Sequence, residues 1–249
     1  MTRVSQGMIE NINSDSWRLC RRQGSHVEGW MKAQCLIVLV LAGLLMPFSA
    51  WAEEPSQVLD RYMERVLKVF EDTSIDDSEG EVEKLKQNLQ AVASEAFSYQ
   101  VMARMSLGHS WKRFNPAQQD EFVQLFTSLL EETYFSKIRQ YFQEIKSYSR
   151  DKVTITDEIV FSSRKSEVQT EMEHKGQKVP VNYRMVKLDG AWQVYDVQVE
   201  GVSLVQNYRS QFQDLMLKNS PEEVLDIVRL KVHGDGGDEL KGISVDSLS

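Results

Sequence analysis

Cysteine is nearly absent from this chain, which has only Cys20 and Cys35 among its 249 residues and none after position 35. The long remainder can therefore form neither a disulfide nor a cysteine-based metal site. It must fold on its hydrophobic core alone, and about 200 residues are enough to build one.

Histidine, glycine-rich phosphate loops and catalytic motifs are equally scarce. The histidines after residue 52, His109, His174 and His233, have no His, Cys or carboxylate pair at the spacing of a metal site. No phosphate loop occurs, so any ATP-driven step must belong to another protein. The segment Gly201-Val-Ser203-Leu-Val205 lacks the last glycine of a nucleophile elbow, and Ser203 is predicted to cap the following helix instead. We expect no cofactor, no metal and no catalytic residue.

Long hydrophobic runs are limited to residues 36–46, and this run is shorter than the roughly 20 residues of a transmembrane helix. Lys32 precedes the run and Ala50-Trp-Ala52 follows it, which is the order of a secretory signal peptide. We interpret residues 31–52 as a signal that is cleaved after Ala52, and the protein is then expected in the periplasm.

The domain organisation follows from this leader. Residues 1–30 are polar and would make an unusually long start of a signal peptide, so translation is expected to begin at Met31. Residues 53–233 are interpreted as a single domain, and residues 234–249 as a polar tail that we predict to be disordered.

Positive charge is in the minority, with 29 Lys and Arg against 37 Asp and Glu and a formal net charge of −8. The first 52 residues hold five basic and three acidic residues, which leaves 24 basic against 34 acidic residues in the remainder. This balance argues against nucleic acid as a partner and against steady adhesion to anionic lipid surfaces.

Apolar periodicity predicts helices in the first half of the domain. A second helix is expected from Val82, and a third from Phe97 that ends at Gly108, because glycine terminates helices. Asn115-Pro116 starts a long helix, with a break expected near Thr133. The first helix carries one stripe with a period of three to four, made of Val58, Leu59, Tyr62, Val66 and Phe70.

The second half of the domain alternates apolar and polar residues, as strands do. Turns are predicted at Lys175-Gly176 and Asp189-Gly190, which join their flanking strands as hairpins. A last helix is expected from Pro221 to Val232, after a left-handed turn at Asn219. The predicted strands cover residues 153–161, 167–173, 179–185 and 191–199. Together these patterns predict an α+β fold, with a four-stranded antiparallel meander and several helices packed on one of its faces.

One continuous block changes its hydrophobic period from that of a strand to that of a helix: Trp192-Gln-Val-Tyr-Asp196-Val-Gln-Val-Glu200-Gly-Val-Ser-Leu-Val-Gln-Asn-Tyr208-Arg-Ser-Gln-Phe212. A second stretch lies upstream and reads Ala103-Arg-Met-Ser-Leu107-Gly-His-Ser-Trp111-Lys-Arg-Phe-Asn115-Pro-Ala-Gln-Gln-Asp120-Glu-Phe-Val-Gln-Leu-Phe126. In their residues and in their order along the chain, both stretches resemble the MlaC family of periplasmic phospholipid carriers, also called the toluene-tolerance or ABC-transporter auxiliary family. The likeness extends over about residues 55–231.

The resemblance implies a soluble carrier that holds acyl chains in an apolar cleft between helices and sheet. Candidate lipid-binding residues are Met102, Met105, Phe122, Phe126, Leu129, Tyr134, Met172, Val181, Tyr183, Met185, Val197, Val199 and Val202. Candidates for headgroup or partner contacts are Arg104, Lys112, Arg113, Arg184 and Arg209.

The resemblance also implies partners. These are phospholipid, an outer-membrane lipoprotein complex, and an inner-membrane ABC transporter complex with its lipid-channel subunit, between which lipid is handed over to keep the outer membrane asymmetric. The carrier itself is expected to be a monomer.

Two other classes of protein remain open at the level of sequence. A periplasmic adaptor would bind a protein partner without carrying lipid, and its core would be filled. A small α+β enzyme of the steroid-isomerase type would need an acid–base pair in its pocket, and Asp157 and Asp196 are the carboxylates on predicted strands with apolar neighbours.

Overall fold

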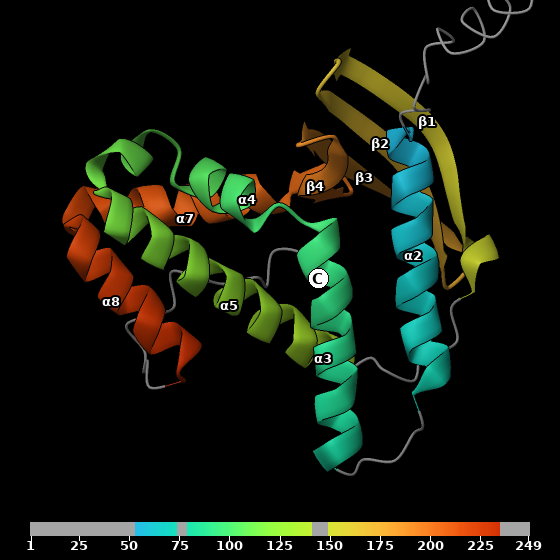
Figure 1. Cartoon of the computed structure of the whole chain (residues 1–249), viewed down its shortest axis with the longest axis horizontal. Helices are drawn as coiled ribbons and strands as arrows, with labels where there is room; N and C mark the ends of the chain where they lie inside the picture. Colours follow the sequence, from blue (N-terminus) through green and yellow to red (C-terminus); the bar gives the residue numbers. More distant parts are fainter. Residues whose placement is uncertain (1–52, 74–78, 141–148, 235–249) are drawn as a thin grey trace, which may run out of the picture. The chain divides into compact units, whose positions relative to one another are not determined.

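The structure, a computed structural model of the chain, describes residues 53–73, 79–140 and 149–234 (Figure 1). The predicted extension, signal peptide and all of the predicted tail except Gly234 lie outside the described residues. None of the helices in these three ranges combines the length and the hydropathy that a membrane span requires.

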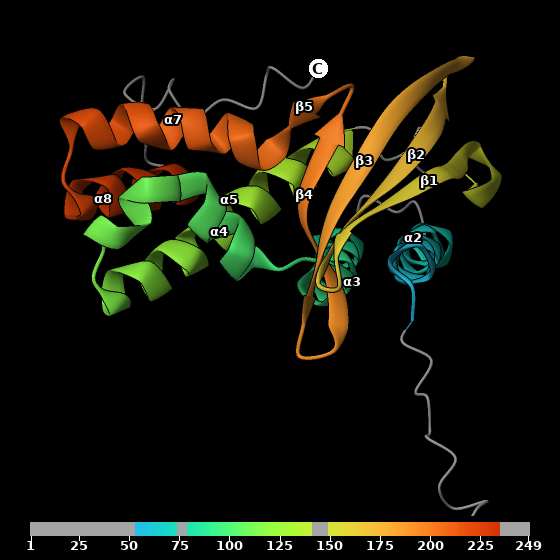
Figure 2. The same ribbon diagram turned by 90° about the horizontal axis from the view of Figure 1, so that it is seen from above.

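Two helices lie against one face of the sheet (Figure 2). Helix α2 (Pro55–Asp72) begins with proline in its first turn, where the missing amide hydrogen costs nothing, and it buries Val58 and Leu59. Helix α3 (Glu79–Ala96) packs beside α2, and Arg65 of α2 forms a two-pronged ion pair with Glu95 of α3, at 2.6 and 3.0 Å. The predicted apolar stripe of α2 therefore packs against both the sheet and α3.

The middle of the chain is helical, as predicted. Helix α4 (Tyr99–Leu107) ends at Gly108, the 3₁₀-helix η1 (Gly108–Arg113) follows, and helix α5 (Pro116–Gln140) begins after Asn115. The Asn115 side chain accepts a hydrogen bond from the Gln118 backbone amide at 3.0 Å, and the Gln118 side-chain oxygen accepts one from the Asn115 backbone amide at 3.1 Å. The predicted break near Thr133 is wrong, because α5 runs on without interruption: no Gly or Pro interrupts it there, and one β-branched residue costs a helix little.

The sheet is a meander in the order β1-β2-β3-β4-β5, with all neighbours antiparallel. Its strands are β1 (Val153–Ser162), β2 (Lys165–His174), β3 (Gln177–Leu188), β4 (Ala191–Val199) and β5 (Val202–Ser203), and the short 3₁₀-helix η2 (Arg150–Lys152) precedes β1. The two predicted hairpin turns are confirmed, because Lys175-Gly176 and Asp189-Gly190 both have positive φ at each position, as type I′ turns require.

The predicted number of four strands is wrong, because the structure has a fifth. Glu200 and Gly201 have φ of 51° and 83°, so they form a third turn of the same kind, and Val202 and Ser203 pair back onto the end of β4. The prediction took Gly201 for a direct switch from strand to helix. A two-residue strand has too few residues to show alternation. The only sequence signal for β5 was the Glu200-Gly201 pair that forms the turn before it.

The four remaining α-helices of the described part lie beyond the β4 edge of the sheet (Figure 2). Helices α7 (Leu204–Lys218) and α8 (Pro221–Val232) complete a bundle with α4 and α5, in which α7 lies against α4 and α8 against α5. Ser203 caps α7 as predicted, since its hydroxyl accepts from the Gln206 amide at 3.0 Å. The prediction of helices on one face therefore describes α2 and α3, while the bundle packs on an edge.

The turn between α7 and α8 differs from the prediction. Asn219 is extended, with φ −129° and ψ 155°, and not left-handed. Its side-chain amide donates to the Leu215 carbonyl at 2.8 Å, which satisfies the helix end without a left-handed residue. Pro221 restricts the preceding Ser220 to an extended conformation, so the two residues between α7 and α8 are both extended.

The apolar core has two parts. The bundle core lies among α4, α5, α7 and α8, and the smaller sheet core lies between α2 and the sheet. Phe97, in the link between α3 and α4, packs against both. The sheet core consists of Val58, Leu59, Val168, Met185, Trp192 and Val194.

A side chain at residue 108 should strain the backbone. The φ of +56° with ψ of −124° favours glycine, and the Arg209 side chain, whose Nε would lie 2.8 Å from an added Cβ, would have to shift. We expect Gly108→Ala to lower the free energy of unfolding by about 1–3 kcal/mol, measured by chemical denaturation. The matched control is Gly80→Ala in the first turn of α3, where an added Cβ meets nothing within 4 Å, and there we expect a gain of about 0.5–1 kcal/mol. Equal stability of Gly108→Ala and the parent would contradict this reading of the turn.

Candidate functional site

One face of the sheet, here called the covered face, is apolar and turns towards α2 and α3. Because side chains alternate along a strand, the pairing register places Val168 of β2, Tyr183 of β3 and Val197 of β4 in one row on this face. The next row holds Ser166, Met185 and Val194.

Helices α2 and α3 bury only part of the apolar surface of the covered face. Val168, Met185 and Val194 are at most 1% exposed. Towards the β2–β3 turn, Met172 and Val199 are only half-buried. The sheet core is therefore ringed by apolar side chains that keep part of their surface accessible, namely Tyr62, Met63, Phe97, Ile155, Tyr183 and Val197.

Tyr183 lies within this partly accessible surface. Part of its side chain remains accessible, and desolvation by the surrounding protein raises the pKa of its phenol to about 12. A partly accessible apolar surface on a rigid sheet is able to accept an elongated apolar ligand.

The predicted lipid-binding residues separate into two groups. In the bundle core Met102, Phe122, Phe126 and Leu129 are at most 3% exposed, and the Phe122 ring packs edge-on against Phe212 at 5.1 Å between centroids. This packing leaves them no accessible surface in the described structure. Met105 and Tyr134 lie half-buried at the border of the bundle core.

The strand residues of the prediction form the second group, and the structure brings them together. On the covered face lie Met172, Val181, Tyr183, Met185, Val197 and Val199. Val202 lies apart on β5 and is 42% exposed.

The sequence prediction did not include four of the partly accessible residues that ring the sheet core: Tyr62, Met63, Phe97 and Ile155. Tyr62 belonged to the recognised stripe of the first helix, and Ile155 to the alternation of the first strand. What was missing was the knowledge that these two elements face each other.

Tyr134 carries an unusual polar atom. Its hydroxyl is buried and has no hydrogen-bond partner among the described residues, and burial, with Tyr208 nearby, raises its pKa well above the usual range. Its neighbour in the chain, Thr133, bonds to the Tyr208 hydroxyl.

Arg184 lies on the opposite face of the sheet from Tyr183 and is already paired. Its Nε lies 3.0 Å from the Glu167 carboxylate and its Nη1 lies 3.7 Å from that of Asp196. Any phosphate would have to compete with both carboxylates for this guanidinium.

The other predicted cations lie in the bundle, on α4, η1 and α7. Arg113 donates to the Met216 carbonyl at 2.9 Å, near the end of α7, and Arg209 packs against Gly108. Arg104 and Lys112 are exposed.

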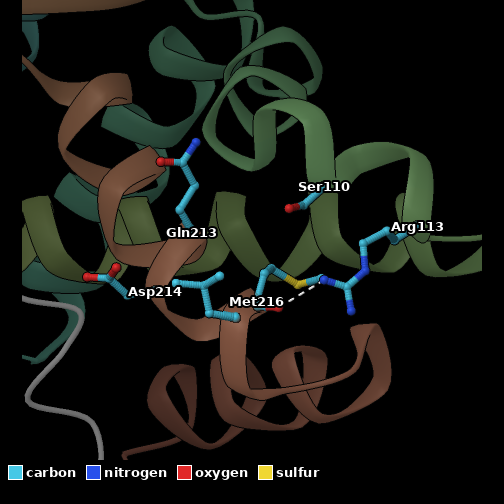
Figure 3. A pocket seen from close by; sticks show the side chains of 6 residues that line it. Ser110, Arg113, Gln213, Asp214 and Met216 are labelled. Carbon is cyan, nitrogen blue, oxygen red and sulfur yellow. Dashed lines mark hydrogen bonds between the residues drawn. The ribbon is translucent and has the colours of Figure 1, made fainter.

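A hollow of about 330 Å³ lies between η1 and α7 (Figure 3). Its lining consists of Ser110, Arg113, Gln213, Asp214, Met216 and Leu217. Charged and amide groups make up much of this lining, so the hollow does not suit acyl chains.

The two carboxylates of the enzyme alternative do not meet. Asp157 is exposed on β1, whereas Asp196 is buried on β4, so β2 and β3 lie between them. Three strand spacings amount to about 14 Å, too far for a shared proton. No three His, Cys, Asp or Glu side chains gather as a metal site would need in the ranges that the structure describes.

The comparisons with known proteins agree with this architecture. The family model described as MlaC protein matches residues 60–229, which is more than half of the chain, and the chain therefore belongs to the MlaC family. A phospholipid-binding protein from Ralstonia solanacearum, solved in complex with a phospholipid, superposes with a TM-score of 0.62 at 18% identity and covers 73% of this chain and 98% of its own. At this identity the shared property is the fold. No curated protein sequence matches the chain significantly.

Asp196 should matter for folding and not for acid–base chemistry. It accepts from the Ser203 hydroxyl at 2.6 Å and from the Val205 amide at 3.0 Å while only 2% exposed. We expect Asp196→Ala to lower the free energy of unfolding by about 2–4 kcal/mol, because these donors and Arg184 lose a buried acceptor. Asp157→Ala, at an exposed position of β1, is the control and should change it by less than about 0.5 kcal/mol in denaturant titration. A stability loss of the same size in both variants would contradict the assigned role.

Proposed function

We propose that this protein is a periplasmic phospholipid carrier that holds acyl chains in a crevice on the covered face, beside α2. The observation that carries the proposal is the ring of half-buried apolar side chains around the small sheet core, in a chain of the MlaC family. The Ralstonia protein with bound phospholipid supports it as a protein of the same fold.

The contact residues that we propose are those that the crevice leaves accessible. They are Met172, Tyr183, Val197 and Val199 from the predicted set, together with Tyr62, Met63, Phe97 and Ile155. Methionine suits such a lining, because its flexible thioether adapts to chains of different length. The aromatic rings of the bundle core are fully buried and are not among the proposed contacts.

Physical chemistry then dictates how such a carrier delivers its cargo. Two acyl chains expose about 30 methylene groups, each worth about 0.8 kcal/mol on transfer from water, so release into water would cost about 20–25 kcal/mol. A bilayer offers the chains nearly the same environment as the crevice, so the net direction depends on partners. We therefore propose direct hand-off at an outer-membrane lipoprotein complex and at an inner-membrane ABC transporter complex with its lipid-channel subunit.

The adaptor is the alternative from another class. It would share the fold and the compartment, but it would purify without lipid. The enzyme alternative has no support from the separated Asp157 and Asp196.

Native mass spectrometry distinguishes carrier from adaptor. The full chain is expressed in a Gram-negative host and purified from the periplasmic fraction without detergent. We expect adduct masses that match phospholipids, that disappear after organic extraction, and whose lipids are recovered in the extract. A bare mass that stays unchanged after incubation with vesicles would overturn the carrier function and favour the adaptor.

A pair of neighbouring substitutions tests where the lipid binds. Val197→Glu places a carboxylate in the crevice, where an acyl chain could bind only by desolvating it, so we expect the phospholipid adduct to be lost. Gln198→Glu is the matched control, because residue 198 faces the opposite side of the same strand, and its adduct should remain.

Thermal unfolding and circular dichroism of both variants check that the fold is intact. Retention of lipid by a folded Val197→Glu protein would move the binding site away from the covered face.

A further inference from the structure

The free end of the β1–β2 hairpin exposes three consecutive apolar side chains: Ile159 is 37%, Val160 66% and Phe161 56% exposed. Scattered apolar residues are normal on a protein surface, but three in a row on an edge strand are not, because exposed edges are commonly protected by charge. In Figure 1 this end of the hairpin lies beyond the N-terminus of α2.

These side chains lie on both faces of the hairpin. Ile159 is paired with Glu167, whereas Val160 is paired with Ser166, so the two side chains point to opposite faces. A groove on a protein partner would cover one face and leave the other exposed. The interface of a bilayer surrounds both.

The edge of this hairpin is also unsuited to pairing with a strand of another protein. The register of β1 and β2 shifts between Val160 and Ser162, so Phe161 lies in a bulge. Bulges interrupt the ladder of backbone hydrogen bonds and protect an edge against an added strand.

Three cations gather at the same end of the sheet: Arg164, Lys165 and Lys187. Nε of Arg164 donates to the Lys187 carbonyl at 3.4 Å, and the Lys187 amide donates to the Arg164 carbonyl at 2.9 Å. Within residues 53–73, 79–140 and 149–234 none of the three forms an ion pair with a carboxylate, Asp189 of the neighbouring turn included. In a chain of net charge −8 this is a local positive surface beside an apolar tip.

We propose that the hairpin tip (residues 159–165) contacts an anionic phospholipid bilayer, with its apolar side chains at the acyl boundary and the three cations at the phosphates. Apolar residues flanked by Lys and Arg are the composition of segments that lie at a membrane interface. The inference deepens the proposed carrier function, since a carrier that approaches a membrane gains from a reversible contact. Three cations and three apolar residues give a transient contact and not a permanent anchor.

A fluorophore on the tip tests the contact. Val160→Cys is labelled with an environment-sensitive dye in a Cys20→Ser and Cys35→Ser background of the full chain, and phosphatidylglycerol vesicles are added. We expect a blue shift and a rise in emission at residue 160. The matched control is Gln177→Cys, an exposed position at the opposite end of the sheet, where no change is expected.

Charge reversal separates membrane contact from non-specific adhesion. Arg164→Glu with Lys165→Glu should weaken binding to phosphatidylglycerol vesicles about tenfold, and phosphatidylcholine vesicles should bind weakly in every case. Absence of the shift at residue 160, or equal shifts at residues 160 and 177, would overturn the proposal. A shift that needs an added membrane-protein complex would overturn it as well, in favour of a protein contact.

The phospholipid adduct in native mass spectrometry keeps the two proposals distinguishable. The charge-reversed tip lies outside the crevice, so its lipid content should equal that of the parent. A chain that contacts vesicles but purifies without lipid would overturn the carrier function alone.

Discussion

The arrangement of the whole fold depends on the carboxylate of Asp196, which joins the sheet to the bundle. It is buried at the end of β4, accepts hydrogen bonds from Ser203 and from the backbone of Val205, and lies 3.7 Å from Arg184. A buried carboxylate is stable only with such donors, so the strand end, the tight turn and the start of α7 must hold one geometry. Arg184 extends the same constraint to Glu167 on β2.

On the two sides of this junction the apolar residues form two different cores. The bundle core is sealed, and Phe122, Phe126 and Phe212 are each 0% exposed. Its stacked and edge-on rings supply stability without any disulfide. The sheet core is small, and the apolar surface around it stays partly accessible, so this part of the fold lacks some of the free energy that full burial would contribute. The proposed lipid site requires this loss, because a fully packed face would have no room for an acyl chain.

Much of the fold could be predicted from the sequence, because its signals are local. Gly108, the Asn115-Pro116 start and the turns at Gly176 and Gly190 each encode a backbone geometry that one or two residues determine. The errors came where a local signal was weak or a substitute was available. Thr133 did not break α5, the two-residue β5 was too short to show a period, and Asn219 satisfied the helix end with its side chain.

The site was less predictable than the fold, because apolar periodicity does not tell a filled core from a lined crevice. Phe126 and Tyr183 carry equal signals in the sequence, and only the packing of elements distant in the chain distinguishes them. For the same reason Ile155 and Tyr62, which come from the first strand and the first helix, were not recognised as neighbours. The family resemblance implied a cleft between helices and sheet, but six of the thirteen candidate residues for its lining lie in or beside the bundle core.

Phe97 links the two cores of the protein. It packs against both cores, and the adjacent Ser98 amide donates to the Val194 carbonyl of β4 at 2.8 Å, so the chain is fastened to the sheet at the point where α3 ends. The sheet core beside α2 holds six buried residues, whereas the bundle core holds eighteen. In the proposed carrier, a wider acyl cargo would disturb only the smaller set, and the bundle would keep its shape.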